Sequence, residues 1–268
     1  MPRNKGRLGV WASIALLVCI VGCARPLPRA ADSGAEVMRV ETPGGPRAVL
    51  ILAPHGPPKA VAVMFPGGDG RIGIGADGSI ARPGNFLIRT RAQWVARDLM
   101  FAAVDAAPNQ AAVHGDRVGP DNIRAIEAIV TALRRRTNAP IWLLGTSAGA
   151  PAALAGAASL PPGAIRGVVV SSPVSMPGTR DSVFDVPLER VAAPVLIQVH
   201  RDDGCRITPP GNAARLKTAL TSARTVEIET FDGGDTPRSS ACEAFAQHGF
   251  LGVEARVVDA AADWILAH

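Results

Sequence analysis

Short segments rich in strand-forming residues, several of them almost continuously apolar, alternate with longer helical segments from residue 36 to the end of the chain. An apolar run of this length is typical of a strand buried on both faces of a sheet. The expected strands cover residues 36–41, 47–53, 60–65, 100–105, 141–144, 167–171, 195–200 and 225–230. The expected helices cover residues 90–98, 121–135, 148–159, 210–221 and 252–267.

This alternation predicts the fold class. Strands that alternate with helices form a mostly parallel sheet of the α/β class, here with about eight strands flanked by helices. Such sheets bind ligands at the carboxyl ends of their strands. Only about twenty residues separate the expected strands that end at Ser171 and begin at Val195, so no large lid domain is expected.

The N-terminal segment has a different pattern. Arg3, Lys5 and Arg7 precede an apolar run over residues 10–21 that only Ser13 interrupts. About a dozen apolar residues are too few for a membrane-spanning helix, which needs about 20. A basic start followed by an apolar run of this length predicts a secretory signal peptide over residues 1–22.

The end of that run resembles the lipobox of bacterial lipoproteins. It reads Ile20-Val21-Gly22-Cys23, with isoleucine where leucine is usual. The resemblance implies cleavage before Cys23 and lipidation of that cysteine; an ordinary signal peptide with an incidental cysteine is the alternative. Ala24 follows, which resembles outer-membrane lipoproteins of Gram-negative bacteria. We therefore expect an exported, lipid-anchored chain on the periplasmic face of that membrane, with a tether over residues 23–35.

The net charge gives little indication of binding partners. The whole chain carries +5, but residues 1–22 hold three basic and no acidic side chains, which leaves +2 for the rest. No run of five or more Lys and Arg residues occurs, so nucleic-acid binding is not expected. Membrane attachment is expected through the lipid alone, and the oligomeric state is left open.

The four cysteines divide by position. Cys19 lies in the signal and Cys23 is the acylation candidate, which leaves Cys205 and Cys242. Outside the cytoplasm two remaining thiols are expected to pair, two separately buried thiols being the alternative. Closing this loop would stabilise the fold by about 4 kcal/mol, less any strain. The His and Cys positions lack zinc-ligand spacing, so neither a metal nor another cofactor is expected.

The strongest chemical signal is Gly145-Thr146-Ser147-Ala148-Gly149, between an apolar segment and an alanine-rich helical segment. A nucleophile elbow needs this order, because its serine occupies a sharp strand-to-helix turn. Glycines two residues to either side remove the Cβ atoms that would clash there. The alternative is a turn serine that does no chemistry. In this context the chain resembles the α/β-hydrolase family, including its dienelactone hydrolases and esterases, over residues 36–268.

The resemblance implies an acid and a histidine after the nucleophile. Family members often read Pro-Val-Leu…His-Gly-x-x-Asp; from Pro194 this places the acid at Asp203, with His200 in place of the usual glycine. That departure keeps Asp202 open as an alternative acid. His248 lies just before the last helical segment, where the family carries its histidine.

The resemblance also implies an oxyanion hole. One donor is the amide of Ala148, directly after the nucleophile. Pro66-Gly67-Gly68 resembles the His-Gly-Gly loop of the family, which makes Gly68 the second donor, with Asp69 as the next choice. The alternative is a flexible glycine turn.

Together these residues predict a serine hydrolase that cleaves an ester, or an amide, through an acyl-enzyme. Two alternatives stay open: an inactive hydrolase-fold lipoprotein that acts as a binding or envelope module, and a serine peptidase. Small or polymeric esters are the expected substrates. Four arginines lie in expected rim segments, where they are candidates to select an acidic acyl group, solvated loop arginines being the alternative: Arg71, Arg82, Arg89 and Arg117.

Overall fold

The computed structural model describes residues 34–107 and 116–268, together with the first two residues. Nearly all of the predicted signal peptide and of the predicted tether, together with the lipidation site Cys23, lies outside the described residues. No helix in the described part of the chain is both long and apolar enough to cross a bilayer.

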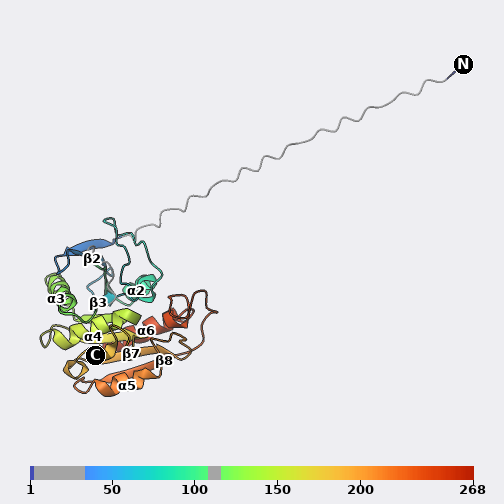
Figure 1. The fold of residues 1–268 in the computed structure, drawn as a ribbon. Helices are drawn as coiled ribbons and strands as arrows, with labels where there is room; N and C mark the ends of the chain where they lie inside the picture. Colours follow the sequence, from blue (N-terminus) through green and yellow to red (C-terminus); the bar gives the residue numbers. More distant parts are fainter. Residues whose placement is uncertain (3–33, 108–115) are drawn as a thin grey trace.

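Eight strands form one sheet in the order β1-β2-β4-β3-β5-β6-β7-β8. The first two pairings, β1 with β2 and β2 with β4, are antiparallel, and the other five are parallel. Figure 1 shows β2 and β8 toward opposite ends of the sheet. The strands are β1 (Glu36–Val40), β2 (Arg47–Leu52), β3 (Ala60–Phe65), β4 (Leu99–Val104), β5 (Ile141–Thr146), β6 (Gly167–Ser171), β7 (Val195–His200) and β8 (Val226–Phe231).

Helices cover both faces of the sheet. One face packs against α3 (Pro120–Arg134), α4 (Ala150–Ser159) and α5 (Asn212–Ala219). The opposite face packs against α1 (Phe86–Arg89), α2 (Arg91–Ala96) and α6 (Glu254–Ala267). The described segment between β6 and β7 holds only two 3₁₀ turns, η2 (Val183–Asp185) and η3 (Leu188–Arg190), so the fold has no lid domain.

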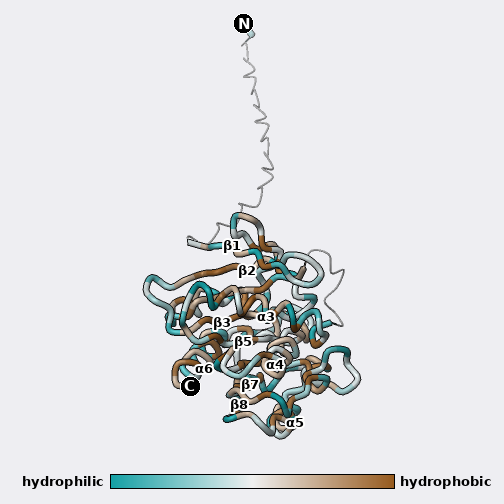
Figure 2. Tube along the Cα trace, turned by 90° about the vertical axis from the view of Figure 1, so that its left-hand side faces the viewer, coloured by the Kyte–Doolittle hydropathy of each residue, from teal (hydrophilic) through white to brown (hydrophobic). Residues whose placement is uncertain are grey.

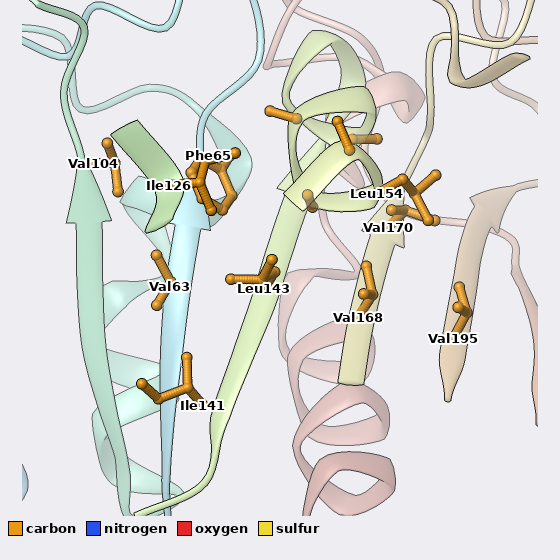
Figure 3. Close-up of a cluster of buried hydrophobic side chains, with 14 of the residues drawn as sticks. Val63, Phe65, Val104, Ile126, Ile141, Leu143, Leu154, Val168, Val170 and Val195 are labelled. Carbon is orange, nitrogen blue, oxygen red and sulfur yellow. The ribbon is translucent and has the colours of Figure 1, made fainter. Parts of the chain in front are cut away.

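The core explains why most positions of the central strands are apolar. Figure 2 shows hydrophobic segments in these strands and hydrophilic segments in outer loops. On one face Leu143 and Val168 lie in the cluster that Ile126 of α3 and Leu154 of α4 complete (Figure 3). Full burial of such a side chain contributes about 1.5–3 kcal/mol. Most buried positions on both faces are therefore apolar, and Gln198 of β7, which is buried among them, donates to Glu229 and to the carbonyl of Val257.

The prediction of a mostly parallel eight-stranded sheet is confirmed, with strand ends shifted by no more than two residues. The helix predicted over residues 90–98 is present as α2, and a short helix that the sequence did not predict, α1, precedes it; the two meet at Thr90. The Thr90 hydroxyl donates to the carbonyl of Phe86 at 2.8 Å, and a threonine that bonds back to the preceding turn bends a helix. The helix predicted from residue 148 begins instead as a 3₁₀ turn, η1 (Ser147–Gly149).

Candidate active site

Ser147 lies directly after β5, at the carboxyl edge of the sheet. Its φ of 53° is in the left-handed region, which non-glycine residues adopt rarely and at a cost. A Cβ on Gly145 would clash with the backbone of Gly149, and a Cβ on Gly149 would clash with the carbonyl of Phe65. Both glycines are therefore required by space, and the strand–turn–helix order gives the serine the geometry of a nucleophile elbow.

The glycine loop after β3 packs against this turn. A Cβ on Gly67 would lie 3.0 Å from Cβ of Ser147, while Gly68 has a φ of 61° and open space beside it. Arg117 holds the loop from behind, because its guanidinium donates to the carbonyls of Pro66 at 3.2 Å and Gly68 at 3.0 Å. Burial lowers the pKa of Arg117 to about 10, so the side chain stays charged at neutral pH.

A second element of the site is a buried pair of ionisable side chains. Nδ1 of His248 lies 3.0 Å from Oδ2 of Asp203, and both side chains are almost fully buried. The other carboxylate oxygen, Oδ1, accepts a hydrogen bond from the amide of Cys205 at 2.9 Å. The hydroxyl of Thr208 donates to Oδ2 at 2.9 Å and lies 3.1 Å from Nδ1 of His248. The Cys205 amide and the Thr208 hydroxyl thus hold the carboxylate and the imidazole in one arrangement.

The alternative acid, Asp202, has a different environment. Its side chain is exposed and forms an ion pair with Arg201 at 3.6 Å. Its amide donates to Nδ1 of His200, and Nε2 of that buried imidazole lies 3.0 Å from the carbonyl of Gly233. Asp203 is therefore the carboxylate against His248, and the histidine in place of the usual glycine is buried beside the loop.

One cavity of about 390 Å³ brings the predicted site residues together. Ser147, His248, Gly67 and Gly68 border it, with Asp203 behind the imidazole. Ala148 follows the serine and is half-buried. Within residues 34–107 and 116–268 the Ser147 hydroxyl makes no hydrogen bond to His248, and in the same ranges no His, Cys, Asp and Glu side chains cluster in a way that would hold a metal ion.

Two rim arginines have structural contacts that the sequence did not indicate. Arg117 lies beneath the glycine loop, as described above. Arg89 donates to the carbonyls of Gly84 at 3.0 Å and of Gly249, and pairs with Glu254 at 2.9 Å. Arg71 and Arg82 do border the cavity, and Arg82 pairs with Asp69 there. Arg89 therefore ties the turn that carries His248 to the loop before α1.

Sequence reasoning also missed Thr208 and Asn85. Thr208 contacts both members of the buried pair, and Asn85 borders the cavity beside Gly67. Neither belongs to a recognisable motif. The order Asp203-x-Cys205-x-x-Thr208 offered one weak signal, because a hydroxyl five residues after an aspartate can return to it within a turn.

A disulfide joins Cys205 to Cys242, the pairing expected from the cysteine count. Cys205 lies two residues after Asp203, and Cys242 borders the cavity six residues before His248. The bond therefore connects the loop that carries the carboxylate to the segment that leads to the imidazole.

Replacing both cysteines by serine should lower the free energy of unfolding by about 4 kcal/mol, less any native-state strain. The reason is the loss of a constraint on the unfolded chain over a sequence separation of 37 residues. Urea denaturation measures the change. Reductant should reproduce it in the wild type and leave the double variant unaffected; equal midpoints for wild type and variant without reductant would contradict the prediction.

No protein-family model matches the chain, and no curated protein is similar to it in sequence. The structure is similar to the esterase domain of a Rhodothermus marinus protein, with a TM-score of 0.60 and 15% identity over 87% of this chain and 98% of that one.

Two further solved structures have the same architecture. A dienelactone hydrolase from Anabaena variabilis has a TM-score of 0.59 and 16% identity over 87% of this chain and 97% of that one. An α/β serine hydrolase without a lid, from Xanthomonas campestris, has a TM-score of 0.56 and 14% identity over 85% and 95% of the two chains. Identities this low bear on fold alone. The chain has the fold of the lidless α/β hydrolases.

Proposed function

We propose that this protein is a serine hydrolase that cleaves carboxylic esters, with Ser147, His248 and Asp203 as its catalytic triad. The observation that carries the proposal is that these residues meet at one cavity. The imidazole of a buried carboxylate–imidazole pair borders the same cavity as a serine held at positive φ. The chain order of serine, acid and histidine is the order found in α/β hydrolases.

In the proposed reaction, Oγ of Ser147 attacks the ester carbonyl while Nε2 of His248 takes its proton. Asp203 holds the imidazole through Nδ1 and stabilises the imidazolium. The amides of Gly68 and Ala148 donate to the oxyanion. His248 then gives the proton to the leaving alcohol, and an acyl-enzyme remains until a water activated by His248 releases the acid.

The shape of the site supports small or polymeric esters as substrates. The cavity is about 390 Å³, near the lower end for ligand pockets. Only two 3₁₀ turns occupy the described segment between β6 and β7, so no lid encloses a long acyl chain. A panel of short p-nitrophenyl esters therefore addresses specificity directly.

A fluorophosphonate probe tests the proposal. The folded wild type should take up one phosphonate per chain, and mass spectrometry should locate it on the peptide that contains Ser147. Urea-unfolded protein is the control and should stay unlabelled, because the buried pair no longer activates the serine. Labelling of a different serine would refute the nucleophile, and a folded but unlabelled protein would favour a binding or envelope module.

We also propose that the chain is exported and anchored by a lipid on Cys23. The lipobox-like residues Ile20 to Cys23 support this, together with the basic and apolar segments before them. In a Gram-negative bacterial host, metabolic labelling with palmitate should mark the wild type, and Cys23→Ser should remove the label. Equal labelling of the two would exclude this cysteine as the lipid site.

A further inference from the structure

Asn85 is a polar residue on the cavity wall that the proposed mechanism does not use. It directly precedes α1, and its Oδ1 accepts a hydrogen bond from the amide of Leu87 at 3.1 Å. This contact assigns the two ends of the side-chain amide, because a backbone N–H requires the oxygen as its acceptor. Nδ2 is therefore the end that faces away from the helix.

Nδ2 of Asn85 faces the nucleophile across Gly67. A Cβ built on Gly67 would lie 3.4 Å from Nδ2 of Asn85 and 3.0 Å from Cβ of Ser147. All three residues border the same cavity. Among the residues that the structure describes, Nδ2 has no hydrogen-bond partner, so its two N–H groups are available to water or to a bound oxygen.

Gly67 is the reason that this space is open. Unlike Gly68, it does not have a positive φ, so backbone conformation does not demand a glycine. Space demands it, because any Cβ would stand between the serine and the asparagine at the distances given above. The loop thus keeps clear the space between the nucleophile and a side-chain donor.

Asn85 is also held in place relative to the imidazole. Arg89 donates to the carbonyl of Gly84, directly before Asn85, and to the carbonyl of Gly249, directly after His248. A donor that is positioned before reaction stabilises developing charge without reorganising, which is the basis of an oxyanion hole.

We propose that Nδ2 of Asn85 donates a hydrogen bond to the oxyanion of the tetrahedral intermediate, as a side-chain donor beside the backbone amides of Gly68 and Ala148. The inference rests on the proposed serine hydrolase function and adds a catalytic residue to it. The competing role is purely structural: Oδ1 caps α1, and Nδ2 is merely hydrated.

Three substitutions separate these roles. Asn85→Ser keeps a neutral capping oxygen but is too short to reach the oxyanion. Asn85→Asp keeps the length and the capping oxygen but has no N–H. Asn85→Ala loses the cap and the donor together. If capping alone matters, the serine variant should behave as wild type and only the alanine variant should lose activity.

With p-nitrophenyl acetate we expect Asn85→Ser and Asn85→Ala to lower kcat alike, by about 10²–10³-fold, with little change in KM. Asn85→Asp should lower kcat at least as much, since it places a negative charge beside the oxyanion. The melting temperature of the serine variant should equal that of the wild type. Affinity for a trifluoromethyl ketone, which forms a tetrahedral adduct, should fall in proportion to kcat/KM.

The two proposals fail in different ways. If the wild type is labelled on Ser147 and the Asn85→Ser variant keeps the full kcat, the proposed role of Asn85 is overturned and the serine hydrolase proposal stands. A loss of kcat that follows melting temperature across the three variants would do the same. A folded wild type that takes up no phosphonate would overturn both proposals.

Discussion

Replacing Ser147 by alanine should lower kcat for p-nitrophenyl acetate about 10⁶-fold. Alanine lacks the Oγ that would form the acyl-enzyme, while the cavity and the glycine loop keep their shape. KM should change little, because the substrate still enters the same cavity. Alanine has to adopt the same positive φ of 53° as the serine, so melting temperature should stay close to that of the wild type. Initial rates and a thermal melt measure both effects.

His248 provides the matched comparison. His248→Ala alone should lower kcat about as much as Ser147→Ala does, and the double variant should be no slower than either single variant. Residues that act as one unit show this non-additivity, because removal of either member already abolishes the shared step. Independent, multiplying losses would contradict a common mechanism. Substantial esterase activity in Ser147→Ala would exclude this serine as the nucleophile.

Replacing Asp203 by asparagine should lower kcat about 10⁴-fold. An asparagine amide placed at the position of Oδ2, 3.0 Å from Nδ1, favours the wrong imidazole tautomer and leaves the imidazolium unstabilised. The substitution preserves size, so the Thr208 and Cys205 contacts have a partner of similar shape. Steady-state kinetics at neutral pH measures the loss.

Asp202→Asn is the control for this substitution. The adjacent carboxylate is exposed and forms an ion pair with Arg201, and an exposed ion pair contributes about 0–1 kcal/mol. Its removal should leave kcat within about twofold of the wild type. A large loss in Asp202→Asn, with little loss in Asp203→Asn, would reverse the assignment of the acid.

The sequence by itself determined the sheet and the elbow, because both depend on local signals. A strand buried on both faces is apolar at most of its positions, which makes the core strands visible as runs such as residues 60–65 and 141–144. The steric demand at Gly145 arises within five residues of chain, because a Cβ there would clash with the backbone of Gly149. The pairing of Cys205 with Cys242 was expected because these are the two cysteines that remain after Cys19 and Cys23 are assigned to the signal peptide and the lipidation site.

Tertiary structure alone decided what depends on the path of the backbone. Asp202 and Asp203 are neighbours with the same chemistry, and only the turn after β7 places one against His248 and the other in solvent. Thr208 contacts the pair because the chain folds back on itself there. The short helix α1, which the sequence did not predict, ends at Thr90, whose hydroxyl donates to the carbonyl of Phe86.

The polar supports of the cavity also came from the structure alone. Arg117 and Asn85 lie far from Ser147 in sequence and belong to no motif, yet one lies under the glycine loop and the other borders the cavity. The pattern of apolar residues indicates which positions are buried, because buried positions are mostly occupied by apolar residue types. It does not indicate which distant carbonyl or amide a polar side chain meets, since that depends on how separate loops converge at the edge of the sheet.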